Sequence, residues 1–101
     1  MILGGNSLEC KSTADGRDYR GYRATTDDGR QCQTWSSHVG VYPLDANTPF
    51  DPIQGYNFPD GSVSRARNYC RNPDRDGKGP WCWTGDREPY NSGYCSIPNC
   101  K

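Results

Sequence analysis

Aliphatic side chains are scarce in this chain, because Leu, Ile, Val and Phe together number 11 among 101 residues. This share is too small to fill the core of an ordinary globular domain, and in a chain of high net charge it would indicate disorder. The charge is balanced, however, since 12 basic residues match 12 acidic ones. The sequence therefore predicts one small folded domain that is stabilised by something other than aliphatic burial.

Two further absences exclude classes of function. No apolar run approaches the length of a membrane span, so we expect no membrane insertion by this domain. The zero net charge lacks the basic excess that is typical of nucleic-acid binding, so we expect no nucleic-acid partner. The apolar start, residues 1–3, is too short for the core of a signal peptide, and we expect the leader to be absent from this sequence.

Six cysteines are available to replace the missing core. Small secreted domains use disulfides in this way, which indicates an oxidising, extracellular location. Sequence alone leaves the pairing open. Zinc binding is the competing use, but the cysteine spacings contain no CxxC pair and His38 is the only histidine. We therefore expect disulfides, with no metal and no other cofactor.

Turn-forming residues divide the chain into short segments. Residues 1–9 precede the first cysteine and are predicted to be a linker or a segment added for expression. Asp-Gly pairs at residues 15–16 and 28–29 are turn signals, and residues 22–26 between them are predicted to form a short strand. Four prolines between residues 36 and 68 exclude long regular structure there.

The residues with the most distinctive chemistry lie between residues 68 and 83. One residue separates Asp74 from Asp76, so in an extended segment both carboxylates point to one side and form one anionic spot. Trp81 and Trp83 have the same spacing and are predicted to form one aromatic surface. A cation with an apolar stem suits such a place, because carboxylates attract its charge and ring faces contact its stem.

The same stretch resembles a known family. Asn-Tyr-Cys-Arg-Asn-Pro-Asp, starting at Asn68, and Pro-Trp-Cys, starting at Pro80, are similar to motifs of the kringle domain, the disulfide-bonded module of plasminogen, prothrombin and related extracellular proteins. Four shorter motifs agree with it: Tyr19-Arg20-Gly21, Gly29-Arg30-Gln31-Cys32-Gln33-Thr34-Trp35-Ser36, Tyr94-Cys95 and Pro98-Asn99-Cys100. The resemblance covers residues 10–100 and implies a small disulfide-rich, loop-rich fold with short antiparallel strands.

The resemblance also implies a disulfide pairing, a binding site and a group of aromatic residues with structural roles. The implied disulfides are Cys10–Cys100, Cys32–Cys82 and Cys70–Cys95, each contributing roughly 3–5 kcal/mol in the chain-entropy model. Asp74 and Asp76 match the anionic centre of a lysine-binding site, and the walls of its trough match Trp81, Trp83 and Tyr94. Three aromatic residues are assigned to structure instead: Tyr19, Trp35 and Tyr69.

The residue types by themselves allow competing interpretations of that site. The aspartates could belong to a solvated turn in which they cap backbone N–H groups. The aromatic residues could serve as core, since this chain has few other residues for that purpose.

The sequence departs from the family pattern between Cys82 and Cys95, a segment that is one residue longer than usual. Ser92 stands where lysine-binding kringles often have an aromatic residue, and Tyr90 is the nearest substitute. Residues 89–93 contain no Lys or Arg to hold the carboxylate of a ligand, and Arg87 is the closest candidate. The sequence therefore does not identify the residues that form one wall of the trough and its cationic end.

The segment from Cys32 to Cys70 is also longer than kringles usually have, with the surplus between residues 38 and 64. We expect a tolerated surface insertion there, which could carry a surface of its own. His38 has no nucleophile motif near it and is expected at the surface. Asn68 begins a rare Asn-X-Cys sequon, but the implied disulfide at Cys70 predicts no glycan.

The sequence thus predicts a non-catalytic, monomeric extracellular module, either secreted or part of a membrane protein. Its expected partner is a protein or peptide that offers a lysine or similar cationic side chain. The alternative is a scaffold that contacts its partner through another surface, for example the 38–64 insertion, without lysine binding. A third interpretation, a hydrolase using Asp74 and Asp76, is disfavoured because residues two apart rarely straddle a bond.

Overall fold

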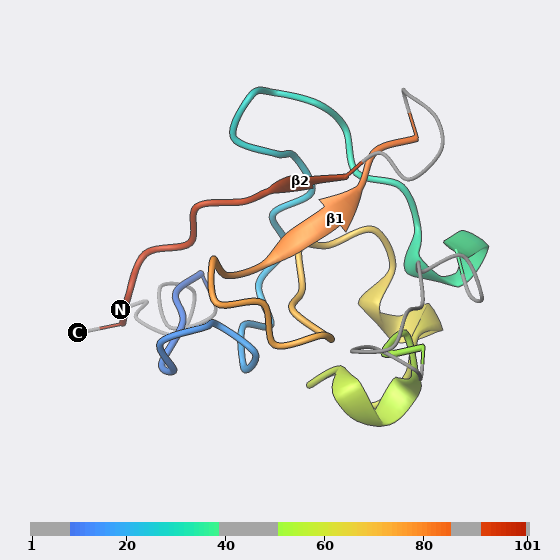
Figure 1. The fold of residues 1–101 in the computed structure, drawn as a ribbon, viewed down its shortest axis with the longest axis horizontal. Coiled ribbons are helices and arrows are strands. Elements are labelled where there is room, and N and C mark those ends of the chain that lie inside the picture. Colours follow the sequence, from blue (N-terminus) through green and yellow to red (C-terminus); the bar gives the residue numbers. More distant parts are fainter. Residues whose placement is uncertain (1–8, 39–50, 86–91, 101) are drawn as a thin grey trace, which may run out of the picture.

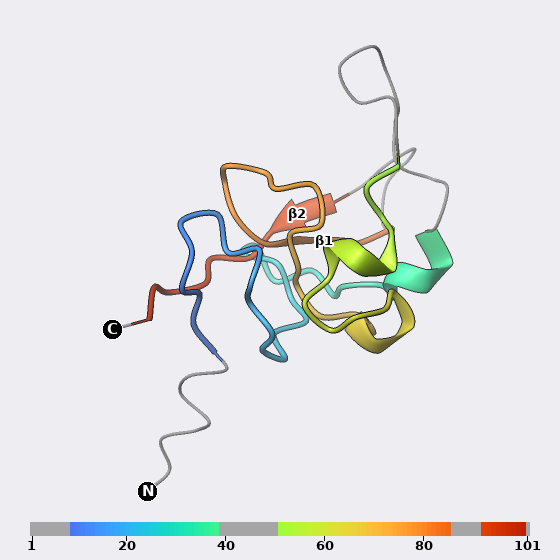
Figure 2. The same ribbon diagram turned by 90° about the horizontal axis from the view of Figure 1, so that it is seen from below.

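The computed structural model describes residues 9–38, 51–85 and 92–100. Its regular elements are short: the single-turn 3-10 helices η1 (Trp35–His38), η2 (Gly55–Asn57) and η3 (Ser64–Ala66), and the strands β1 (Trp81–Trp83) and β2 (Ser92–Tyr94). In both views the three helices gather at the end of the molecule away from the blue and red ends of the described chain (Figures 1 and 2). No helix in these ranges is long and apolar enough to cross a membrane.

Strands β1 and β2 form an antiparallel pair near the centre of the molecule (Figure 1). The register places Trp81 opposite Tyr94 and Trp83 opposite Ser92. On its other side, Trp81 exchanges two backbone hydrogen bonds with Arg71, at 3.0 and 2.9 Å. The segment that carries Asp74 and Asp76 therefore leaves directly from the edge of this small sheet.

Three disulfides join the fold: Cys10–Cys100, Cys32–Cys82 and Cys70–Cys95. They are the pairs that the resemblance implies. The sulfur atoms of the second and third lie within 4.8 Å of one another, and all four cysteines are buried. Because these sulfurs are bonded in pairs, none is a thiolate that could bind a metal. The first disulfide joins the two ends of the domain, where the Lys11 carbonyl oxygen accepts from the Cys100 N–H at 2.8 Å.

Aromatic rings pack around the two central disulfides and replace the missing aliphatic core. Trp35 is fully buried, and its ring lies 5.2 Å from the ring of Phe58 and 4.9 Å from that of Trp81. Its indole N–H donates to the Tyr69 carbonyl at 2.7 Å. Tyr19 is also fully buried, and burial raises the pKa of its hydroxyl to about 12. These contacts agree with the structural roles assigned to the three residues from the sequence.

The described part of the long segment, residues 51–64, contributes to this core. Ile53 and Phe58 are 1% and 4% exposed, whereas Tyr56 between them is 84% exposed. The single turn of η2 lies between the two buried residues and leaves Tyr56 on the outer side. The expectation of a tolerated surface insertion is therefore incomplete, since part of the surplus fills space beside Trp35.

The strand expected over residues 22–26 does not form, and that prediction is wrong. Only Thr25 makes an isolated bridge, with Gln31. Neighbouring backbone groups bond to different segments: the Arg23 carbonyl accepts from Cys70 N–H at 2.8 Å, and the Ala24 carbonyl from Cys32 N–H at 2.9 Å. The pairing with the 30–32 segment stops at this single bridge, so no ladder of consecutive pairs forms.

Two glycines allow close approach between segments. Gly16 has φ +71°, and a Cβ there would lie 2.7 Å from the ring of Pro80. A Cβ on Gly93, in β2, would lie 2.6 Å from the Arg30 guanidinium and 2.8 Å from the Thr26 methyl. Arg30 and Thr26 therefore pack on the Gly93 face of the sheet, opposite the face that carries Trp81 and Tyr94.

Candidate ligand-binding site

The β1–β2 pair positions all three aromatic residues of the predicted site on one face of the sheet. Trp81 and Trp83 are two apart in β1, and their ring centroids lie 5.0 Å apart at 81°. Tyr94 lies directly across from Trp81. Exposure differs sharply, because the two tryptophans are 5% and 3% exposed and Tyr94 is 39% exposed. The tryptophans form a buried base, and Tyr94 offers the accessible ring.

A buried asparagine shapes the turn that carries the two aspartates. The Asn72 side chain accepts from the Asp76 N–H at 2.8 Å and donates to the Asp76 and Asp15 carbonyls at 2.9 and 2.6 Å. Arg75, between the aspartates, has φ +55°. The segment is thus a tight turn instead of the extended stretch on which the spacing argument relied.

Both carboxylates nevertheless contact the aromatic face. Asp74 Oδ1 accepts from the indole N–H of Trp81 at 2.9 Å. Asp76 Oδ2 accepts from the Tyr94 hydroxyl at 2.6 Å, and its Oδ1 accepts from the Lys78 N–H at 2.9 Å. We call Asp74, Asp76 and the three aromatic residues of the sheet the aspartate site. The structure brings all five predicted residues together, the aspartates through a turn like the one in the competing interpretation of the sequence, in which Asp76 also caps the Lys78 N–H.

The electrostatics of the aspartate site show in Tyr94. The hydrogen bond to Asp76, together with burial and the charge of both aspartates, raises the pKa of its hydroxyl to about 12. The anionic carboxylates therefore dominate the local field. A cation of the chain itself responds to that field, since the Lys78 ammonium lies 5.6 Å from the centroid of the Tyr94 ring.

His38 and Trp83 form a contact that sequence reasoning missed. Their rings stack at 5.2 Å and 7°, and the histidine is half-buried instead of lying free on the surface. The buried indole N–H of Trp83 makes no hydrogen bond with any residue in the described part of the chain. No motif marks this pair, because the two residues come from different segments that only the fold brings together.

Two candidates for completing the trough, Arg87 and Tyr90, lie outside the described residues. Ser92 is exposed at the end of the sheet, where its carbonyl accepts from the Arg30 guanidinium at 3.2 Å. Arg30 reaches it along the Gly93 face, so this cation does not share a face with Trp81. Asn68 is half-buried and donates to the Cys32 carbonyl at 3.3 Å.

Comparison with known families agrees with the geometry. The family model described as "Kringle domain" matches residues 10–100, a span that begins and ends at a disulfide-bonded cysteine. Kringle domains are generally non-catalytic extracellular modules that mediate protein–protein interactions. The structure has the features of such a module, with three disulfides, one small antiparallel sheet and loops in the described remainder. The chain belongs to the kringle domain family.

Proposed function

We propose that this domain is a non-catalytic, monomeric extracellular module that binds a lysine or similar cationic side chain of a partner protein at the aspartate site. One observation carries the proposal: two carboxylates converge on one aromatic face, each held by a ring hydrogen bond, at 2.9 Å for Asp74 and 2.6 Å for Asp76. Carboxylates held in this way need little rearrangement to receive a cation. An accessible ring beside them accepts the apolar stem.

Lys78 supports the proposal from within the chain. Its ammonium lies over the Tyr94 ring, at 5.6 Å from the centroid, although the side chain is free to extend into solvent. The ammonium of a partner lysine would find the same attraction from the ring and from Asp76. The two charges repel each other, so the ligand displaces Lys78 from the ring.

The position of the charges also favours a hydrolytically inactive site. Asp74 and Asp76 both face one side, towards Trp81 and Tyr94, instead of straddling a cleft in which a bond would be cut. We therefore assign the pair to binding. We infer that the domain works outside the cell, secreted or attached to a membrane protein, and its three disulfides support this location.

The proposed ligand is a lysine within the partner's chain, in preference to a lysine at the partner's C-terminus. A terminal lysine would offer a free carboxylate, which needs a cation at the far end of the aromatic face. Arg30, the arginine that reaches Ser92, approaches along the opposite face. From the described residues we therefore expect a free carboxylate on the ligand to gain at most the 0–1 kcal/mol, roughly, of an exposed ion pair.

A direct test compares Asp76→Asn with Asp28→Asn. Asp28 is an exposed aspartate that is paired with Arg30 at 2.9 Å, away from the aspartate site. Asp76→Asn removes a carboxylate that contacts the ligand, so the binding free energy of pentylamine should weaken by roughly 1–3 kcal/mol. Asp28→Asn should bind pentylamine as tightly as the wild type within experimental error. Isothermal titration gives both values. Equal affinities for the two variants would remove the aspartate pair as the cation centre.

The same titration with 6-aminohexanoate tests the form of the ligand. Both compounds should bind weakly, roughly micromolar to millimolar, and within a factor of about three of each other. A preference of more than tenfold for the amino acid would reveal a cation that receives the carboxylate, and Arg87→Ala would then be the informative variant.

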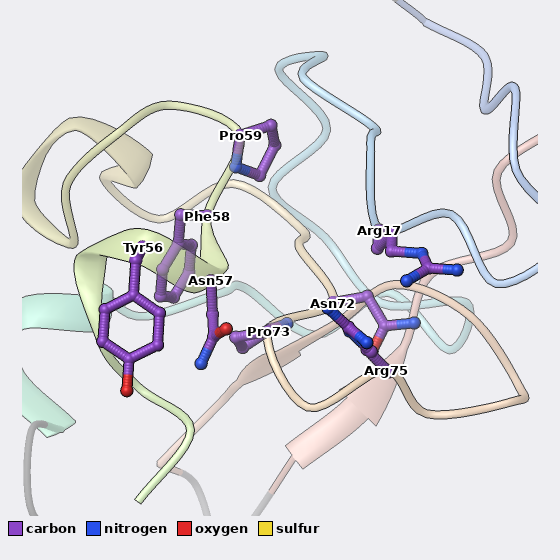
Figure 3. A pocket seen from close by; sticks show the side chains of 8 residues that line it. All are labelled: Arg17, Tyr56, Asn57, Phe58, Pro59, Asn72, Pro73 and Arg75. Carbon is purple, nitrogen blue, oxygen red and sulfur yellow. The ribbon is translucent and has the colours of Figure 1, made fainter.

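A second candidate function rests on the hollow in Figure 3, which has a volume of about 190 Å³. Tyr56, 84% exposed, borders it together with Arg17 and Arg75, and Phe58 forms part of its wall. Arg75 thus points away from the aspartate site. A large exposed ring of the 51–64 segment beside two cations favours a contact with a partner protein through this surface. Tyr56→Ala would weaken such a contact without changing amine binding.

A further inference from the structure

A larger hollow, with a volume of about 350 Å³, is bordered by four arginines: Arg20, Arg65, Arg67 and Arg71. We call it the arginine hollow. It shares no lining residue with the aspartate site. Among the residues that the structure describes, Asp60 is the only acid that borders it.

Asp60 is fully committed to one of the four arginines. Its two carboxylate oxygens accept from Arg71 Nε and Nη2 at 2.8 and 2.9 Å. The remaining Arg71 donor, Nη1, reaches the Gly21 and Cys70 carbonyls at 2.9 and 2.8 Å, and the residue is 1% exposed. Arg71 and Asp60 are therefore a structural pair that cancels its own charge at the wall of the hollow.

The other three arginines have no such partner. Arg20, Arg65 and Arg67 are exposed, and within the described residues their guanidinium groups form no hydrogen bond and no ion pair. The contrast with other arginines is clear, because Arg23 and Arg30 are paired with aspartates at 3.3 and 2.9 Å.

The backbone that carries two of these cations is held in place. The Arg67 carbonyl accepts from the N–H of the buried Trp35 at 2.9 Å, and its N–H donates to Ser64 at 3.2 Å. Arg67 has φ +49°, a conformation that side chains other than Gly rarely adopt. Arg65 belongs to η3. The two guanidinium groups thus extend from a turn that is fixed against the core, which lowers the entropic cost of binding.

An aromatic rim completes the arginine hollow. Tyr22 is 60% exposed, and its ring meets the ring of Tyr69 edge-on at 5.3 Å. No aliphatic side chain in the described part of the chain borders the hollow, which thus offers no apolar pocket of the kind that anchors a peptide side chain. Its chemistry is three unpaired guanidinium groups beside one open ring face.

We propose that the arginine hollow binds a sulfated oligosaccharide. Guanidinium groups match the planar, bidentate geometry of oxyanions, and sulfate groups keep their charge at every physiological pH. A saccharide ring presents C–H groups that stack on the face of Tyr22. An acidic peptide offers the charges, but it gains nothing from a shallow hollow without an apolar anchor. The inference stands apart from the aspartate site and is tested separately.

The test measures binding of a heparin-derived hexasaccharide by surface plasmon resonance. The triple variant Arg20→Ala/Arg65→Ala/Arg67→Gly should lower the affinity at least tenfold, because each lost ion pair with a sulfate weakens binding roughly threefold. Glycine is chosen at residue 67 because its φ is positive. Tyr22→Ala should lower the affinity a further threefold or so. Raising NaCl from about 0.1 M to about 0.3 M should weaken wild-type binding by roughly tenfold, as ion release requires.

A matched control removes the same charge elsewhere: Arg17→Ala/Arg75→Ala/Lys78→Ala, three exposed cations that do not border the arginine hollow. It should lower the affinity no more than about twofold. An equal loss in both triple variants would show a general charge effect and overturn the site. An oligo-glutamate peptide of equal charge that binds as tightly as the hexasaccharide would overturn the ligand class. Circular dichroism, expected unchanged for every variant, and amine binding, expected unchanged for the variants of the arginine hollow, verify the fold.

Discussion

The aspartate site and the arginine hollow hold their charges in opposite ways. At the aspartate site each carboxylate accepts a hydrogen bond from a neighbouring ring, from Trp81 to Asp74 and from Tyr94 to Asp76. In the arginine hollow three guanidinium groups have no described partner. Asp60, the acid described at this hollow, is already paired with Arg71. The net charge of zero is a sum over the whole chain, so it does not reveal that two surfaces of opposite sign exist or where they lie.

The two surfaces also differ in how the chain assembles them. The aspartate site uses residues from one turn and one small sheet, within a recognisable motif. The arginine hollow joins Arg20 and Tyr22 to the 60–71 segment, and the fold alone makes them neighbours. A sequence motif can indicate the first kind of site, whereas the second kind is found only from the three-dimensional structure.

Reduction of the disulfides should abolish both surfaces together, which is the largest effect that we expect. The 11 aliphatic and Phe residues cannot offset an ordering entropy of about 1–2 kcal/mol per residue. Near-UV circular dichroism with and without reductant, followed by amine and hexasaccharide titrations, checks it. A tertiary signal that survives full reduction would show that the aromatic core suffices alone.

Arg71→Met should separate the structural arginine from the others of the arginine hollow. The variant leaves the Asp60 carboxylate and two backbone carbonyls without their donors, so the free energy of unfolding should fall by about 3 kcal/mol. Arg65→Ala, at an exposed position of the same hollow, should change it by no more than about 0.5 kcal/mol. Denaturant unfolding with intact disulfides measures both. Similar losses would mean that the hollow is one structural network.

Asp18, which lies on neither surface, should govern acid stability. Although burial opposes it, hydrogen bonds from Ser12 and Thr13 lower the pKa of the Asp18 carboxyl to about 2 from its usual 3.8. A lowered folded-state pKa contributes stability above pH 3.8 that is lost as the pH falls through about 2. Asp18→Asn should therefore cost about 1–2 kcal/mol at pH 6, with solvent screening included, and flatten the acid profile.

The measurement for Asp18 is denaturant unfolding of wild type and Asp18→Asn between pH 2 and pH 6. If the difference between wild type and Asp18→Asn stays constant across that range, the carboxyl does not titrate as described. Amine binding at pH 6 should be unchanged, because Asp18 does not belong to the aspartate site.

The smallest expected effect is at Lys78. Its ammonium over Tyr94 competes with an incoming amine, so Lys78→Ala should strengthen pentylamine binding by about twofold to fivefold. Arg75→Ala removes the same charge from a side chain that borders the hollow of Figure 3 instead, and it should change the affinity less than twofold. Weaker binding in Lys78→Ala would make Lys78 part of the ligand contact and not a competitor.

The cysteines and the motif around Asn68–Asp76 carried most of what the sequence predicted. The resemblance named the fold, and the structure contains the three implied disulfides. The spacing argument placed Asp74 and Asp76 on one side for the wrong reason, because Asn72 folds the segment into a turn. Local spacing cannot report a side chain that bonds four residues along the chain.

Other features depend on contacts between distant segments. Ile53 and Phe58 read as part of a polar, proline-rich insertion, yet they fill the core beside Trp35. His38 had no motif, yet it stacks on Trp83. The strand expected over residues 22–26 does not form because its pairing stops at the single Thr25–Gln31 bridge. Each miss concerns a long-range pairing, which residue types and periodicity do not specify.

The most direct test of the account is a two-dimensional NMR titration with pentylamine that follows the indole N–H of Trp81 and the ring signals of Tyr94. Because these two groups hold Asp74 and Asp76, the account predicts saturable shifts at both, which need a much higher amine concentration in Asp76→Asn and the wild-type concentration in Asp28→Asn. Saturable binding that moves neither the Trp81 nor the Tyr94 signal, or that persists unchanged in Asp76→Asn, would contradict it.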